Sequence, residues 1–475
     1  MKKHALTLII ATCLWAGASP AFAELSLERP QIVLPDFGDP ASSVLSSTNE
    51  SHLGLKLLRE VRGSDPTIED PELSTWLQNL GKRLVARAPN GGQYYFVIAK
   101  NPEMNAYAMP GGVIVIHSGL ILNTSSESEL AAVVAHEIAH VSQRHIARML
   151  ADQRGSPLLT GLGVLAGAAA ATKNPEAGEA IITGTIAAQA HSQLAFSRQA
   201  EAEADRVGLQ ILAGAGFDPG AMPSFLEKLD RRSNDKLYGN IAKYVRTHPL
   251  SLDRVSDTRS RAAQMGGAKQ PDDVSYLYAR EKLRALLAPS SPAQAMGNAN
   301  IAQYAQALRQ LRAGNSPAAL QALRGGAGAL PVTLAMAQAH NQARQYEAAE
   351  ALLLPLSRSH PGHEGVLAPL AEAMLASGKA AQAWQLLSQH RLQELSSLEF
   401  LEVRQRVAEA AGQGAEAYAS AAERSLRMGE YKHARASLEQ ASRLPGTPAH
   451  TAARLQAMAG DISRMERQAK ALDKF

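Results

Sequence analysis

His136 and His140 flank Glu137 in the run His-Glu-Ile-Ala-His. On a helix, a spacing of four residues places both imidazoles on one face, one turn apart, where they can bind a single tetrahedral ion. Glu137 projects beside them and is positioned to take a proton from water and pass it to a leaving amine. This pattern is the HExxH motif, which predicts zinc-assisted peptide hydrolysis. The competing interpretation is a pair of histidines that only make surface hydrogen bonds.

A catalytic zinc site needs a third protein ligand and one position left open for water. The best candidate is Glu201, which shares a helical face with Asp205 in the segment 197–205. Small residues on the same helix would let it approach the histidine helix closely, namely Ala200, Ala204 and Gly208. Composition alone favours a solvated acidic helix, but the pairing with the HExxH motif reverses that preference.

The helix that carries the two histidines is expected to begin near Ser126, because Ser126 and Glu129 match a capping box. Apolar residues then recur at helical spacing and mark its buried face, namely Leu130, Val134, Ile138 and Val141. We expect this helix to continue through Leu150. A β-rich run at 113–116 precedes it and is predicted to be a strand.

Residues 1–23 have the features of a secretory signal peptide. Lys2 and Lys3 precede an apolar run, and Ala21-Phe22-Ala23 provides a cleavage signature of small residues. The only cysteine, Cys13, lies inside this signal, in a context that matches lipid attachment poorly. The mature chain is therefore predicted to have no disulfide, although export implies an oxidising compartment.

The composition is that of an ordinary globular protein, with 45% hydrophobic and 19% charged residues among 475. Removal of Lys2 and Lys3 with the signal lowers the 48 basic side chains to 46, against 44 acidic ones. This balance, without a long basic run, gives no support for nucleic-acid binding. The length favours two domains or more.

The first domain is expected at 24–287. It combines predicted helices and strands at 53–61, 73–87, 94–98, 113–116 and 197–213. An apolar segment of small residues at 155–195 is interrupted in its middle, and neither half reaches the roughly 20 residues that span a bilayer. We interpret it as a helical hairpin packed on the protein, or alternatively as a mobile lid or a surface that touches a membrane.

A linker at 288–298 is followed by a helical region at 299–475 that repeats. Triplets of equal internal spacing mark the repeats: Ser316, Ala319 and Leu323; Tyr346, Ala349 and Leu353; Ala380, Ala383 and Leu387; Tyr431, Ala434 and Leu438. The units begin 30, 34 and 51 residues apart, and the last interval equals 34 plus 17, one extra helix. A period of 34 resembles tetratricopeptide (TPR) repeats, and an irregular α-helical domain is the alternative.

The predicted fold class is therefore mainly α. An α+β zincin metallopeptidase domain with a small sheet is followed by an all-α TPR solenoid domain.

The HExxH motif is followed about 60 residues later by Ser-Arg-x-x-Glu-x-x-Ala-Asp, beginning at Ser197. Together these motifs resemble the gluzincin peptidases of the HtpX and CAAX-prenyl-endopeptidase family, and the signal peptide and repeats make the chain similar to a periplasmic member. The resemblance implies one Zn2+ per chain, bound by His136, His140 and Glu201, with Glu137 as general base. It implies a proton-donor role for Asp205, whereas we prefer a carboxylate that orients a ligand histidine.

His248, in Thr-His-Pro, matches another histidine of the family. The resemblance implies that His248 can reach the zinc, either to cap the open position at rest or to stabilise the oxyanion. Arg198 is interpreted as holding Glu201 or a neighbouring carboxylate, or alternatively as a surface arginine. His145 and His191 are off the motif pattern and are interpreted as structural.

The run 113–116 is predicted to form an edge strand that lines the cleft. Extended substrates would then add to it by main-chain pairing, which imposes little sequence specificity. On this basis the expected substrate-binding residues are Gly112, Val113, Ile114 and Val115.

The hypothesis is quality control of outer-membrane proteins in the periplasm. Unfolded or stalled barrel precursors would be bound by the concave surface of the repeats and cut at the zinc. The resemblance implies these substrates and a contact of the TPR domain with the β-barrel assembly machinery. Peripheral membrane contact is one of the alternatives for the segment 155–195. One alternative is a chaperone or assembly factor in which proteolysis is secondary, and another is an unspecialised periplasmic peptidase.

Overall fold

The computed structural model describes residues 45–64, 66–152, 197–233, 242–267, 274–288, 298–326 and 328–472 of the chain. The predicted signal peptide with Cys13, the segment 155–195 with His191, and most of the linker 288–298 lie outside these residues. Among the described helices, none combines the length and the apolar character needed to cross a membrane.

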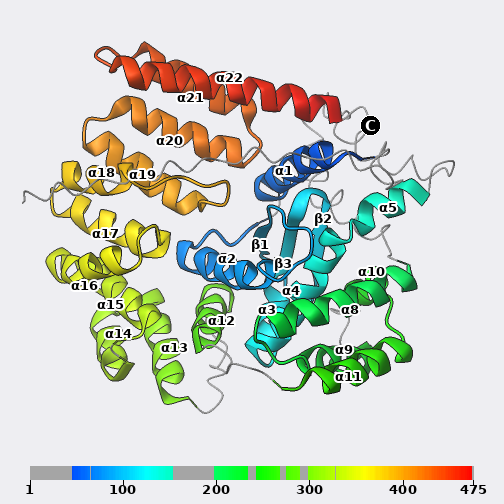
Figure 1. Ribbon diagram of the computed structural model, residues 1–475. Helices are drawn as coiled ribbons and strands as arrows, with labels where there is room; N and C mark the ends of the chain where they lie inside the picture. Colours follow the sequence, from blue (N-terminus) through cyan, green and yellow to red (C-terminus); the bar gives the residue numbers. More distant parts are fainter. Residues whose placement is uncertain are drawn as a thin grey trace, which may run out of the picture. The chain divides into compact units, whose positions relative to one another are not determined.

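A three-stranded sheet lies among the N-terminal helices (Figure 1), formed by β1 (Tyr95–Ala99), β2 (Ala106–Met109) and β3 (Val113–His117). The strand order is β1–β3–β2. β1 runs parallel to β3, and β2 runs antiparallel to it. The predicted strands at 94–98 and 113–116 are confirmed, while β2 was not predicted.

Both faces of this sheet are buried, which explains the uninterrupted apolar run of β3. Ile114 and Ile116 belong to a core shared with α2 (Pro71–Val85) and α4 (Glu127–Ser142). Val113 and Val115 point the other way and pack with Leu58 and Val61 of α1 (Ser47–Ser64). Alternate side chains of a strand point to opposite faces, so a strand covered on both sides needs apolar residues throughout.

The prediction that 113–116 forms an edge strand is wrong. β3 is the middle strand, and β1 and β2 pair with it on its two sides. The main-chain groups of Val113, Ile114 and Val115 therefore already pair with β1 and β2. Gly112 is the last residue of the short 3-10 turn Pro110–Gly112 that precedes the strand. These residues offer no free edge to a substrate.

The helix α4 that carries the histidines begins as predicted and ends earlier than predicted. The Ser126 hydroxyl accepts a hydrogen bond from the backbone N–H of Glu129 at 3.1 Å. The Glu129 carboxylate accepts the N–H of Ser125 at 2.7 Å, one residue before the partner of a standard capping box. Arg144, with φ of 53°, breaks the helix, and α5 (His145–Asp152) continues the chain.

A second helix, α8 (Arg198–Gly214), packs along α4 and brings the acidic motif to it. Its cap is Ser197, whose hydroxyl accepts the N–H of Ala200 at 3.1 Å. Ala204 is fully buried, and a Cβ placed on Gly208 would lie 3.2 Å from the Cα of His136. The predicted close approach of the two helices through small residues is confirmed.

The remaining described helices of this region lie on either side of these two in the sequence. The helix α3 (Ser118–Asn123) precedes α4, and α8 is followed by α9 (Ala221–Ser233), α10 (Ala242–Thr247), α11 (Leu252–Met265) and α12 (Val274–Leu287).

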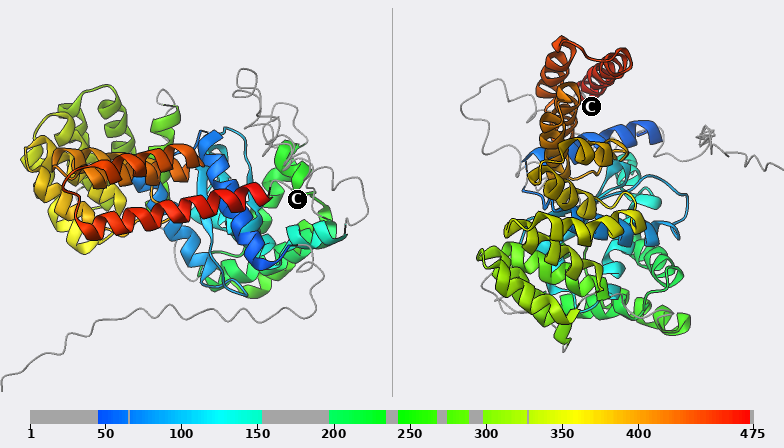
Figure 2. Two further views of the ribbon diagram at one scale, coloured as in Figure 1. Left: turned by 90° about the horizontal axis from the view of Figure 1, so that it is seen from above. Right: turned by 90° about the vertical axis from the view of Figure 1, so that its left-hand side faces the viewer.

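The C-terminal region is helical throughout its described residues, as Figures 1 and 2 show. Its α-helices are α13 (Ala299–Arg312), α14 (Ser316–Leu323), α15 (Leu330–Gln342), α16 (Tyr346–Ser359), α17 (Glu364–Ala376), α18 (Ala380–Ser388), α19 (Leu398–Ala410), α20 (Gly414–Arg427), α21 (Tyr431–Arg443) and α22 (Ala449–Leu472). Each repeated triplet opens a helix, at Ser316, Tyr346, Ala380 and Tyr431. The predicted extra helix is also present, because both α19 and α20 lie between α18 and α21. The predicted fold class, mainly α with a small sheet and a helical C-terminal region, is confirmed.

Contacts join α1 to this helical region. The Arg62 guanidinium donates to the backbone carbonyls of Glu394 and Ser396, each at 3.2 Å, and forms an ion pair with Glu69 at 2.6 Å. Glu69 in turn accepts the N–H of Leu398 at 3.0 Å. These charged contacts with main-chain groups anchor the loop before α19 to α1.

Candidate metal centre

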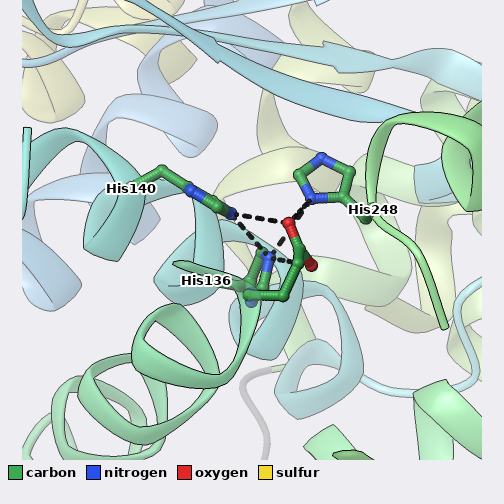
Figure 3. Close-up of side chains that lie close together, drawn as sticks. His136, His140 and His248 are labelled. Carbon is green, nitrogen blue, oxygen red and sulfur yellow. Dashed lines mark hydrogen bonds and ion pairs between the residues drawn. The ribbon is translucent and has the colours of Figure 1, made fainter. Parts of the chain in front are cut away.

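Four buried side chains converge on one point between α4, α8 and the end of α10. They are His136, His140, Glu201 and His248, and one potential ligand atom from each lies within 4.8 Å of the others. Figure 3 shows the three histidine rings pointing at a shared carboxylate, which belongs to Glu201. The structure thus brings together the four residues from three distant parts of the sequence.

The spacing of these atoms fits a tetrahedral ion. Zinc bonds to nitrogen and oxygen near 2.1 Å place neighbouring ligand atoms about 3.4 Å apart. The Nε2 atoms of His136 and His140 are 3.0 Å apart, and Glu201 oxygens lie 3.5 and 3.4 Å from them. His248 Nδ1 lies 3.0 Å from Glu201 and 3.3 Å from His136. Imidazole nitrogens with a carboxylate form the donor set that zinc prefers, so these residues fit that metal.

His136 and His140, the two candidate ligand histidines, are each held by a contact on the side away from the centre. The Nδ1 atom of His136 lies 3.0 Å from Asp205, so that its Nε2 atom faces the centre. The Nδ1 atom of His140 lies 2.8 Å from the ring of His145, which is buried. Such contacts set the orientation of a ligand histidine and the ring nitrogen that stays free for the metal.

Arg254 connects the carboxylates of the centre. It donates to both oxygens of Asp205, at 2.7 and 2.9 Å, and its Nη1 atom lies 2.7 Å from Glu201. Arg254 was not predicted from the sequence. The sequence offers little indication of this role, because Arg254 stands in no motif and is recognisable only by its place six residues after His248, in the first turn of α11. Arg198 is exposed at the start of α8, which agrees with its interpretation as a surface arginine.

Burial and mutual contacts shift the pKa values of the centre in opposite directions. Burial acts to lower the pKa of His136, but hydrogen bonds with Asp205 and Glu201 outweigh it and raise the value to about 10. Burial lowers the pKa of His140 well below its ordinary value. For Glu201, burial is outweighed by His248, His136 and His140, which hold its pKa well below the usual range. The neighbouring carboxylates thus favour the charged form of His136, whereas burial disfavours the charged form of His140.

Glu137 lies beside the four candidate ligands and contacts strand β2. Its side chain is fully buried, and its Oε2 atom accepts the backbone N–H of Ala108 at 3.0 Å. Its Oε1 atom lies 3.5 Å from Nε2 of His248. Burial is the main reason that the pKa of Glu137 is raised. A raised carboxyl pKa suits a group that takes and returns a proton near neutral pH.

Comparison with known proteins gives a consistent result. The model of "Peptidase family M48" matches residues 71–262. The chain is 36% identical over 385 residues to the "Beta-barrel assembly-enhancing protease" of Escherichia coli strain K12, a match that covers 81% of this chain and 74% of that protein. A protein of the same name from Yersinia pestis is 35% identical, covering 80% and 74%. "Mitochondrial metalloendopeptidase OMA1" of Arabidopsis thaliana is 28% identical, covering 45% of this chain and 44% of its own.

Proposed function

The chain belongs to peptidase family M48 and is a metalloprotease, and we propose that it uses zinc to cleave unfolded or stalled outer-membrane proteins and so supports β-barrel assembly. The observation that carries the proposal is the buried convergence of His136, His140 and Glu201 on one point, with Glu137 beside it. The link to barrel assembly is supported by the relatives named "Beta-barrel assembly-enhancing protease", and the unfolded or stalled state of the substrates is our proposal.

The proposed roles follow from the geometry. A bound zinc ion supplies Lewis acidity that polarises the scissile carbonyl and makes water more acidic. His136, His140 and Glu201 hold that ion, and Asp205 keeps the free nitrogen of His136 directed at it. Glu137 accepts the proton of the attacking water and delivers it to the departing nitrogen of the peptide.

We assign substrate pairing to β2 instead of the residues of β3. The N–H of Ala108 points away from β3, toward Glu137, so the outer edge of β2 borders the centre. The opposite edge of the sheet is engaged, because Ile98 accepts the N–H of Ile68 at 2.9 Å and Phe96 accepts the Gln78 side chain at 2.6 Å. An extended chain laid along β2 would bring its backbone to Glu137.

His248 is proposed to cap the centre at rest. Its Nδ1 atom takes the fourth place around the centre, and a zinc ion held by four protein ligands has no position for water. Catalysis therefore requires His248 to leave that place. A closed centre would protect other periplasmic proteins from an enzyme whose main-chain pairing is unselective.

The remaining parts of the proposal concern location and organisation. We place the enzyme in the periplasm, exported by the signal 1–23 and associated with the outer membrane. The catalytic domain is assigned to 24–287 and a TPR-like domain to 299–475, consistent with the end of α12 and the start of α13. The repeats are assigned the selection of barrel precursors and a contact with the assembly machinery.

The test is metal content together with cleavage of casein and of an unfolded barrel protein, for the wild type and Glu137→Gln. We expect one zinc per chain in both proteins and at least a 100-fold loss of cleavage in the variant, the usual scale for a missing general base. Chelation should abolish the wild-type cleavage, and added zinc should restore it. Undiminished cleavage by Glu137→Gln, or a protein without stoichiometric metal, would refute the proposal.

A second candidate function is that of a chaperone or assembly factor. If His248 caps the centre at rest as proposed, the helical repeats would still be exposed to clients while cleavage is blocked. If Glu137→Gln keeps outer-membrane assembly intact in cells, the repeats carry the main role and proteolysis is secondary. If deletion of 299–475 leaves the choice of substrates unchanged, the enzyme is an unspecialised peptidase.

A further inference from the structure

The ring of Tyr244 stacks on the ring of His248. Their centroids are 4.7 Å apart and their planes differ by 29°. Tyr244 lies one helical turn earlier, on α10, and is only 3% exposed. On a further side it meets Phe225 edge to face, with centroids 6.0 Å apart. Tyr244 is thus held in the hydrophobic core and supports His248 directly.

The backbone next to His248 is fixed at two points. The N–H of His248 donates to the carbonyl of Tyr244 at 2.8 Å. One residue later, the carbonyl of Pro249 accepts Arg254 at 2.8 Å. The main chain is therefore anchored on both sides of His248. The anchored main chain does not fix the direction of the imidazole, because the His248 side chain can still rotate about its own bonds.

From this geometry we propose that Tyr244 is a positioning residue whose ring holds the imidazole of His248 in the capping place. The stack fixes the plane in which His248 Nδ1 meets Glu201 at 3.0 Å and Nε2 faces Glu137 at 3.5 Å. Movement of His248 away from the centre breaks this ring contact, so Tyr244 biases the enzyme toward its capped form. The inference rests on the proposed function, because it assigns a support to the proposed cap.

The expected size of the bias is modest. An aromatic pair contributes to an equilibrium by about 2- to 10-fold beyond the area that it buries. Loss of the stack should therefore raise the uncapped population by that factor. A rise of this size is measurable as a rate at which the bound metal becomes accessible to a competitor.

The experiment uses the full-length, zinc-loaded protein and measures the rate of zinc transfer to a chromophoric chelator. The visible spectrum of the cobalt-substituted protein serves as a second readout, because it reports the ligands around the ion. Tyr244→Leu should transfer zinc about 2- to 10-fold faster than the wild type. Tyr244→Phe keeps the ring and should match the wild type. In a His248→Ala background, Tyr244→Leu should cause no further change, since the supported ring is already gone.

A matched control is Tyr304→Leu. Tyr304 on α13 is 1% exposed and meets Tyr278 of α12 edge to face, with ring centroids 4.9 Å apart. Equal acceleration in this control would show that lost core packing, not the stack, exposes the metal, and would overturn the inference.

Other outcomes separate the two proposals. If His248→Ala leaves the zinc-transfer rate and the cobalt spectrum unchanged, His248 does not cap the centre. The proposed cap and the proposed role of Tyr244 are then both refuted. If His248→Ala accelerates transfer but Tyr244→Leu does not, the cap stands and the role of Tyr244 is refuted. The role is equally refuted if Tyr244→Phe behaves like Tyr244→Leu, or if the effects of Tyr244→Leu and His248→Ala add.

Discussion

Replacement of Asp205 by asparagine tests whether the centre depends on the orientation of His136. Both oxygens of Asp205 act only as acceptors. One lies 3.0 Å from Nδ1 of His136 and 2.9 Å from Arg254, and the other accepts Arg254 at 2.7 Å. Asparagine has one oxygen and one donor group in the same place, so it can serve only one of these partners fully.

Either orientation of the asparagine amide is unfavourable. If its oxygen faces His136, its NH2 group meets the donating guanidinium of Arg254. If it is reversed, the NH2 group faces Nδ1 and favours the tautomer that carries its proton on Nε2, the atom proposed to bind the metal. Loss of one hydrogen bond to a charged group costs about 1.5–3 kcal/mol, which corresponds to about 10- to 150-fold in binding. This agrees with the 10- to 100-fold typical of residues that orient a metal ligand.

The assay is zinc affinity by competition with a chelator, together with casein cleavage at saturating zinc. The matched control is Asp257→Asn on α11, whose carboxylate also pairs with arginines, Arg206 and Arg261, but at the surface. We expect little change there, because exposed pairs contribute little. If Asp205→Asn binds zinc and cleaves casein as the wild type does, the orienting role is wrong.

Three further predictions concern packing and stability. Gly208→Ala should lower zinc affinity at least several-fold, because its Cβ would lie 3.2 Å from the His136 backbone and 3.1 Å from Met222. The control is Gly214→Ala, whose Cβ would face only the Arg87 side chain at 3.4 Å and which should leave zinc affinity unchanged. Arg62→Ala should lower the free energy of unfolding by about 2–3 kcal/mol in denaturant titration, because Glu69 and two carbonyls lose a charged partner; a loss no larger than that of Lys56→Ala on the same helix would contradict this. Burial acts to raise the pKa of Glu69, but Arg62 and the N–H of Leu398 lower it below 4.5. The Glu69 carboxylate therefore stabilises the fold above pH 4.5, and this stabilisation is lost as the pH falls through the depressed pKa. Glu69→Gln should therefore flatten the acid decline of the melting temperature, and an unchanged decline would exclude Glu69 as a cause.

The parts of the structure that follow local rules were predictable from the sequence. Ser126 and Ser197 each cap a helix with the hydrogen bond that their positions imply. The repeated triplets were recognisable because each carries a small residue, such as Ala349 or Ala383, that is fully buried where two helices approach closely. The positions of His136, His140 and Glu201 depended only on two helices and their periodicity.

The errors have a common physical origin in contacts between distant segments. Strand β2 is short, and its main chain is defined by pairing with β3, which no local pattern reveals. Assignment of the edge to β3 followed from missing β2. The break at Arg144 depends on a positive φ at a residue that does not usually favour it, so an uninterrupted helix to Leu150 was the natural expectation. Arg254 acquires its role only because α11 folds against α8.

The charges of the centre explain why Arg254 is needed there. Glu137, Glu201 and Asp205 are three carboxylates in an almost water-free environment, and burial of each without compensation would cost several kcal/mol. Arg254 supplies one positive charge, so a divalent ion would make the set neutral when all three carboxylates are ionised. Burial raises the pKa of Glu137, so its charge is the one that most needs such an ion nearby. Loss of Arg254 would therefore disturb the centre through charge as well as through geometry.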